Sequence, residues 1–211
     1  MSVVVAIKKD GVIYFGADSQ VTKGGTRTTL SNPNNYKIWS VDGVDNCLMG
    51  SVGAVRASNV VRVAYDLIPE LVDLKCAVDF RFVVKRLVPQ IMDELAEHKI
   101  LTKDSDGVPY MNASFLLAYH DKLFSIDGFG CVIEVDDFCA IGSGASEALG
   151  SLLSTADVED PIRRILSAIK ASAMHDIYVD YPIIISDTES TDFKVYYEKD
   201  LAELGNGNSS R

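Results

Sequence analysis

Residues 2–25 read SVVVAIKKDGVIYFGADSQVTKGG and decide how the chain begins to fold. The run up to Lys9 is β-branched, and the run VIYFGAD, which ends at Asp18, is rich in β-branched and aromatic residues. Asp10-Gly11 separates the two runs, and Asp-Gly is a preferred pair for a tight hairpin turn. The stretch therefore predicts a β-hairpin, and we expect the chain to begin inside a sheet.

Strand and helix patterns then alternate in blocks along the chain. Residues 19–35 are rich in Thr, Gly, Asn and Ser and are expected to form a loop, as is the polar segment TKDSDG at 102–107. Further strands are predicted at residues 36–41, 46–52, 112–119, 122–128, 131–135, 138–142, 182–186 and 193–198. Apolar residues at helical spacing predict helices over 54–72 and 80–95, after Gly144, and from Asp160-Pro161. Four strands should thus precede the first helix.

The order of these blocks predicts an α+β fold, a four-layer αββα sandwich of two antiparallel sheets flanked by helices. Each amphipathic face needs a partner, and two stacked sheets with helices on both outer sides supply one for every element. Pro69 and Pro89 should kink or interrupt the first two helices, because proline lacks an amide donor. We expect one domain over residues 1–200 and a flexible tail over 201–211, whose end GNGNSSR has little apolar surface.

The composition of the chain excludes several kinds of partner and binding site. The formal net charge of -10 makes nucleic acid a poor partner. The four cysteines are far apart and there are three histidines, so neither a metal site nor a disulfide framework is predicted, and no cofactor is expected. The apolar run before Lys8 is too short for a signal peptide, and no segment approaches ~20 apolar residues. A cytoplasmic protein that does not enter membranes is the expectation.

Ser2 is the residue with the most distinctive chemistry. If Met1 is removed, Ser2 carries a hydroxyl nucleophile and a free α-amine, whose ordinary pKa is about 7.7 to 8.0 and which can take the hydroxyl proton. Such a serine does not need a histidine as its general base, because its own α-amine has that role. On its own, however, a serine after the initiator methionine is common and has no functional meaning, so its neighbours must decide.

Those neighbours resemble a known family. The run from Ser2 to Ile7, the turn at Asp10-Gly11 and the segment from Gly16 to Thr22 resemble the opening of proteasome β subunits. They are equally similar to the bacterial proteasome-like ring peptidase that works with an AAA+ unfoldase; both groups are N-terminal-nucleophile hydrolases.

The resemblance assigns roles to the residues of this opening segment. It implies that Ser2 is the nucleophile and that Asp18 pairs with a lysine. Lys37, within Tyr36-Lys37-Ile38, is our assignment for that lysine, and Lys23 is the weaker alternative. Without the resemblance, Asp18 would be a turn former and Lys37 a surface lysine.

Three later positions fit the same family. The resemblance implies that Gly53 supplies a backbone N–H to the oxyanion, that Ser143 in Gly-Ser-Gly lies near the nucleophile's amine, and that Asp176 orients this network. Taken alone, these residues indicate a strand-to-helix turn, a helix cap and a helix end. The chain departs from the family at Val179 and Asp180, where serine and glycine are usual, so the support of Asp176 is altered.

Three hypotheses follow. The first is a self-compartmentalising serine-type endopeptidase that cuts peptides or unfolded proteins inside a homo-oligomeric ring, with an AAA+ ATPase as a further partner. The second is a catalytically silent scaffold subunit that keeps Met1, which would block the amine of Ser2. The third is an N-terminal-nucleophile amidase acting on a small molecule, because a fold does not fix its substrate.

Overall fold

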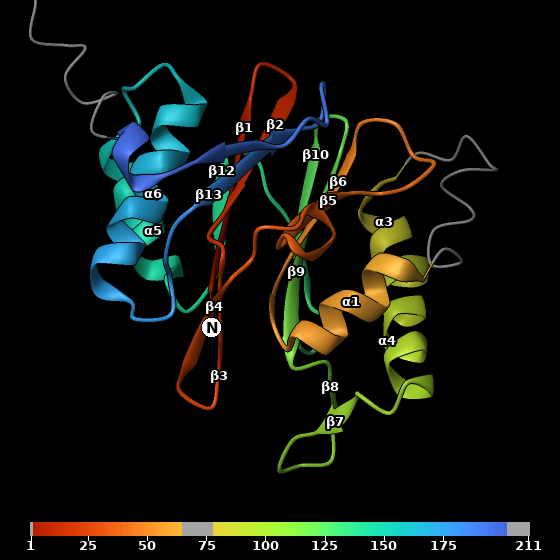
Figure 1. Ribbon diagram of the computed structural model, residues 1–211. Coiled ribbons are helices and arrows are strands. Elements are labelled where there is room, and N and C mark those ends of the chain that lie inside the picture. Colours follow the sequence, from red (N-terminus) through yellow and green to blue (C-terminus); the bar gives the residue numbers. More distant parts are fainter. Residues whose placement is uncertain (1, 65–77, 202–211) are drawn as a thin grey trace, which may run out of the picture.

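The computed structural model describes residues 2–64 and 78–201, which include two five-stranded antiparallel sheets packed face to face (Figure 1). The strands of the first sheet are, in spatial order, β12 (Phe138–Gly142), β1 (Val3–Lys9), β2 (Val12–Ala17), β13 (Ile183–Asp187) and β14 (Lys194–Tyr196). Those of the second are β11 (Val132–Glu134), β10 (Lys122–Ile126), β9 (Ala113–Tyr119), β6 (Cys47–Gly53) and β5 (Ile38–Ser40).

The opening hairpin is formed as the sequence predicts. β1 and β2 pair antiparallel, with Lys9 opposite Val12, so the connection is the two-residue turn Asp10-Gly11. Both turn residues have positive φ, 52° for Asp10 and 83° for Gly11, as a type I′ hairpin turn requires. β1 also pairs with β12 on its other side, which makes it an inner strand of the sheet.

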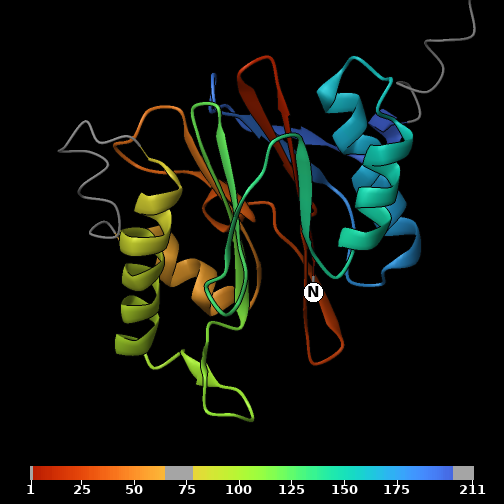
Figure 2. The same cartoon turned by 180° about the vertical axis from the view of Figure 1, so that it is seen from behind.

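Helices cover the outer face of each sheet (Figure 2). On the first sheet lie α5 (Ala145–Ser154) and α6 (Pro161–His175), the latter capped by the Asp160 side chain, which accepts from the N–H groups of Ile162 and Arg163. On the second lie α1 (Val55–Val63), α3 (Phe80–Phe82), a π-helical turn (Val83–Leu87) and α4 (Val88–Glu97). The predicted four-layer αββα sandwich is confirmed.

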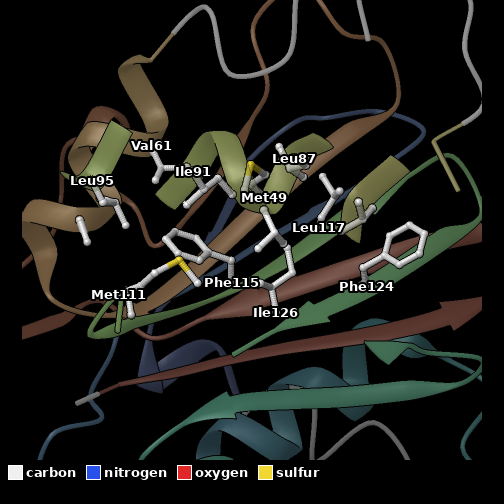
Figure 3. Packing of buried hydrophobic residues seen from close by; sticks show 14 of the residues in the cluster. Met49, Val61, Leu87, Ile91, Leu95, Met111, Phe115, Leu117, Phe124 and Ile126 are labelled. Carbon is white, nitrogen blue, oxygen red and sulfur yellow. The ribbon is translucent and has the colours of Figure 1, made fainter. Parts of the chain in front are cut away.

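Apolar residues fill the three spaces between these four layers. β1 alternates between two of them: Val4 and Ala6 face the other sheet, whereas Val3, Val5 and Ile7 pack on α5 and α6. The third space lies between the second sheet and its helices. Figure 3 shows the packing of buried side chains in this space, among them Met49, Val61, Leu87, Ile91 and Phe115.

Two expected loops contain strands instead. Residues 19–35 form the hairpin of β3 (Gln20–Lys23) and β4 (Thr26–Thr29) and a short 3₁₀ turn at Pro33–Asn35, so six strands precede α1 rather than four. The segment 102–107 contributes to a small hairpin of β7 (Thr102–Lys103) and β8 (Pro109–Tyr110). Both loop predictions were wrong because these strands are mostly exposed and carry no apolar alternation.

Pro89 interrupts helix geometry, as expected. It lies at the start of α4, directly after the π-helical turn, in which the Val88 N–H bonds to the Val83 carbonyl. Pro69, Cys76 and the end of the first predicted helix lie outside the described residues, as do residues 202–211. Leu201 still packs against the cluster under α5 and α6. Within residues 2–64 and 78–201, no helix is long and apolar enough to cross a membrane.

Candidate active site

The carboxylate of Asp18 lies at the centre of the site, fully buried between the end of β2 and the start of β3. Its Oδ1 accepts from the backbone N–H of Val3 at 2.9 Å and from Nζ of Lys37 at 2.7 Å. Its Oδ2 accepts from the backbone N–H of Gln20 at 3.0 Å. A single side chain therefore connects the residue after Ser2 with the lysine that the sequence nominates.

Lys37 lies just before β5 and is only 8% exposed. Besides Asp18, its ammonium donates to the backbone carbonyl of Gln20 at 2.6 Å. Lys23, the weaker alternative, is exposed at the end of β3. The structure thus places Lys37, and not Lys23, against Asp18.

Burial shifts both members of this pair. It lowers the pKa of the Lys37 ammonium, an effect opposed by Asp18 and by the charge of Asp176. It raises the pKa of the Asp18 carboxyl, opposed by Lys37 and by the N–H groups of Val3 and Gln20. A lysine whose pKa is lowered by burial beside a cleft is a common feature of functional sites.

Ser2 is almost completely buried at the first residue before β1. Its backbone N–H donates to Oγ of Ser143 at 3.0 Å, and its carbonyl accepts from the N–H of Gly144 at 3.4 Å. Gly142 approaches so closely that a Cβ there would lie 2.1 Å from the Ser2 carbonyl oxygen. The Gly-Ser-Gly turn after β12 therefore holds the backbone of Ser2 in place.

Gly53 ends β6 and precedes α1. Its φ is +105°, in the region that L side chains rarely adopt, and a Cβ would lie 2.5 Å from the carbonyl oxygen of Asn112. Glycine is required here for both reasons. Ser2, Lys37 and Gly53 line one cleft that is partly open to solvent.

Asp176 follows the last residue of α6. Its Oδ1 accepts from the N–H of Tyr178 at 2.9 Å, whereas its Oδ2 is buried and accepts no hydrogen bond within the described residues. Val179, where the family has serine, is buried and packs against Gly144. It offers no hydroxyl to Asp176, so the support of this carboxylate is altered as the sequence indicates.

Asp180, the second departure, holds the β3–β4 hairpin. Its carboxylate pairs with Arg27 of β4 at 3.0 Å, and its backbone carbonyl accepts from the Ser19 N–H at 3.1 Å.

Sequence reasoning missed Gln20 as a member of the site. Both its backbone groups serve the pair of Asp18 and Lys37, and its side-chain amide donates to the carbonyl of Ile177 at 2.9 Å and to Thr22 at 2.8 Å. Gln20 therefore connects β3 with the segment that carries Asp176. The sequence did contain a signal for Gln20: it lies two residues after Asp18, and in an Asx-type turn the aspartate side chain accepts from the backbone N–H at that position.

Among residues 2–64 and 78–201, no group of three or more His, Cys, Asp or Glu side chains is placed to hold an ion.

An antiparallel αββα sandwich, in which a serine directly precedes the inner strand β1 near a buried lysine–aspartate pair, is the fold of N-terminal-nucleophile hydrolases. The family model for proteasome subunits matches residues 2–186, so the chain belongs to the proteasome subunit family. At the level of the family, it is a proteasome-type N-terminal-nucleophile peptidase.

Solved structures with this fold come from several organisms. Thiobacillus denitrificans BPH is 20% identical with a TM-score of 0.71, covering 88% of this chain and 96% of that one. Eukaryotic HslV from Trypanosoma brucei is 19% identical with a TM-score of 0.64, covering 88% of this chain and 98% of that one. Anbu from Yersinia bercovieri is 17% identical with a TM-score of 0.70, covering 97% of this chain and 94% of that one.

Replacing Asp18 by asparagine should destabilise the protein in a pH-dependent way. Lys37 would lose the carboxylate that pairs with it at 2.7 Å, and breaking a buried ion pair costs about 3–5 kcal/mol. The pKa of Lys37, already lowered by burial, would fall further, so the folded state would bind fewer protons than the unfolded state. The free energy of unfolding should therefore rise with pH towards the ordinary lysine pKa of 10.5, more steeply than in the wild type.

Denaturant unfolding between pH 6 and pH 10 measures this difference. Asp121→Asn is the matched control, because it removes a carboxylate from the largely exposed pair with Lys8 at 3.7 Å. Equal effects of the two substitutions, or equal pH slopes for Asp18→Asn and the wild type, would contradict the account.

Replacing Gly53 by alanine should destabilise the protein more than the same change at Gly25. Gly25 also has a positive φ, +82°, but a Cβ there would meet nothing within 4 Å, so its cost is backbone strain alone, about 1–2 kcal/mol. Gly53→Ala adds a clash with the backbone at Asn112. Thermal unfolding of both variants checks this, and equal losses would show that the strand end moves freely.

Proposed function

We propose that this chain is a self-compartmentalising serine-type endopeptidase that hydrolyses peptides or unfolded proteins. The observation that carries the proposal is the position of Ser2: it lines the cleft with Lys37 and Gly53, and the next residue is hydrogen-bonded to Asp18. Removal of Met1 would turn the Ser2 nitrogen, 3.0 Å from Ser143 Oγ, into a free amine at the same place.

The reaction begins with attack of Ser2 Oγ on a peptide carbonyl carbon, while the α-amine of Ser2 takes the hydroxyl proton. The ammonium of Lys37 favours the developing alkoxide and lowers the pKa of the amine, and Asp18 fixes that ammonium. The N–H of Gly53 stabilises the oxyanion. The amine then gives its proton to the leaving nitrogen, and water hydrolyses the resulting ester and restores Ser2.

We further propose that the protein acts as a homo-oligomeric ring, with an AAA+ ATPase as a partner that supplies unfolded substrate. Membership of a family of proteasome subunits supports the ring. Large apolar side chains around α5 and α6 remain exposed in the single chain: Leu153 by 70%, Met174 by 71% and Ile177 by 75%. Met174 and Ile177, in the last turn of α6 and just after it, are close in sequence, and a neighbouring subunit of the ring would cover them.

A catalytically silent scaffold subunit is the second candidate. Val179 favours it, because this buried side chain leaves Asp176 without a neighbouring hydroxyl donor where the family usually has serine.

Hydrolysis of fluorogenic peptides by the purified protein tests the proposal. Ser2→Ala should abolish turnover because it removes the nucleophile, and Lys37→Ala should lower it by roughly a hundredfold or more. Lys23→Ala, which removes an exposed lysine nearby, should keep the wild-type rate. Size-exclusion chromatography of each variant controls for assembly.

Wild-type turnover in Ser2→Ala would contradict the proposed nucleophile. Loss of activity in Lys23→Ala but not in Lys37→Ala would contradict the assignment of the lysine. A wild-type protein that forms a ring, retains Met1 and cleaves no peptide would be the scaffold subunit.

A further inference from the structure

The cleft beside Ser2 is lined by both apolar and polar side chains, and Arg62 and Lys37 are cations among them. The apolar lining includes Val21, Leu30, Val52 and Val55. Its polar lining includes Asn35, Ser51, Ser58, Asn59 and Arg62. Ser58, Asn59 and Arg62 belong to α1, which begins at Val55, two residues after Gly53.

Arg62 is a half-buried cation that pairs with no carboxylate of residues 2–64 and 78–201. Its guanidinium donates to the backbone carbonyls of Asn34 and Tyr36 and lies over the ring of Trp39, 4.6 Å from the centroid. Its Nε–H is buried and donates no hydrogen bond within the described residues. No ion pair joins Arg62 to an acidic residue in that part of the chain, and burial lowers the pKa of Arg62 to about 10.

The described residues that line the cleft together with Arg62 include no acidic side chain. The hydroxyls of Ser51 and Ser58 are hydrogen-bonded to each other at 2.7 Å, and Asn35 and Asn59 are neutral. Arg62 and these two asparagines also line a second hollow that includes Arg56, so the positive character continues beyond the cleft. A half-buried cation with no acidic group beside it in the cleft is only partly compensated, and an anion placed in the cleft is favoured electrostatically.

Substrate geometry decides which group of a peptide enters this cleft. When Ser2 Oγ attacks a carbonyl carbon, the side chain of the same residue lies next to Ser2, and this is the residue N-terminal to the cleaved bond. Its methylene groups would contact the apolar lining of the cleft, and its end would contact the polar lining. Because the chain carries a net charge of -10, long-range attraction does not favour acidic peptides, so any preference for them must arise in the cleft.

We propose that the cleft selects a glutamate or aspartate immediately N-terminal to the cleaved bond, with Arg62 as the residue that determines this specificity. The inference rests on the proposed peptidase function. It adds the class of bond that the peptidase cuts, and it makes Arg62 a binding residue and not a part of the proton-transfer machinery.

A panel of fluorogenic peptides that differ only at this position, with Glu, Gln, Leu or Lys, tests the inference. The wild type should show its highest kcat/KM with Glu, at least about tenfold above the neutral isostere Gln. Arg62→Gln should reduce the ratio of Glu to Gln cleavage to near one while cleavage of the Leu peptide continues. Arg56→Gln is the matched control: it removes an equal charge from the same helix, outside the cleft that Ser2 lines, and should leave the ratio above about tenfold.

A second variant keeps the test decisive if Arg62→Gln does not fold. Asn59→Asp places a carboxylate in the cleft without removing Arg62, and it should lower the Glu to Gln ratio at least about fivefold by repulsion and by pairing with Arg62. Cleavage of Leu or Lys peptides in preference to Glu, with a ratio unaffected by Arg62→Gln and Asn59→Asp, would overturn the inference and leave the peptidase intact. Absence of cleavage across the panel would instead contradict the proposed function on which the inference rests.

Discussion

The hydrogen bonds of the Asp18 carboxylate are the interaction on which the geometry of the site depends. One oxygen of this side chain binds the N–H of Val3 and the ammonium of Lys37, and the other binds the N–H of Gln20. These partners belong to the start of β1, the segment before β5 and the start of β3. A buried carboxylate with several donors resists displacement, because each lost partner would leave a charged group unsatisfied in a poorly polarisable environment.

The sandwich explains how such a polar group can be accommodated between two apolar layers. Asp18 directly follows Ala17, the last residue of β2 in the first sheet, and Lys37 precedes β5, at the edge of the second. The pair therefore lies where the two sheets end, next to the cleft and not in the centre of the inter-sheet core. On the opposite side of Ser2, the Gly-Ser-Gly turn after β12 binds the same backbone. The first residue of the mature chain would thus be fixed from both sides.

The sequence predicted those parts of the fold that local pattern determines. The Asp-Gly turn, the alternation of β1 and the spacing of α5 and α6 identified the hairpin and the layers, because buried strands and amphipathic helices have regular apolar periods. β3–β4 was missed because β4 is exposed along its whole length and has no such period. Ser2, Asp18, Lys37, Gly53, Ser143 and Asp176 were nominated through a resemblance in their order and spacing. Gln20 and Arg62 were not, because their importance comes from contacts between layers: Gln20 with Ile177, and Arg62 with Trp39.

The central claim is that a free amine and a hydroxyl of the same residue, Ser2, stand beside the pair of Asp18 and Lys37. An electrophilic peptide inhibitor that reacts with N-terminal nucleophiles is a suitable probe of this claim. The most direct measurement is intact mass and peptide mapping of the protein from its native cell after incubation with this inhibitor. The account predicts a chain that lacks Met1 and carries one adduct on the peptide that begins at Ser2. A chain that lacks Met1 but carries no adduct, or an adduct elsewhere, would contradict it, as would a chain that retains Met1.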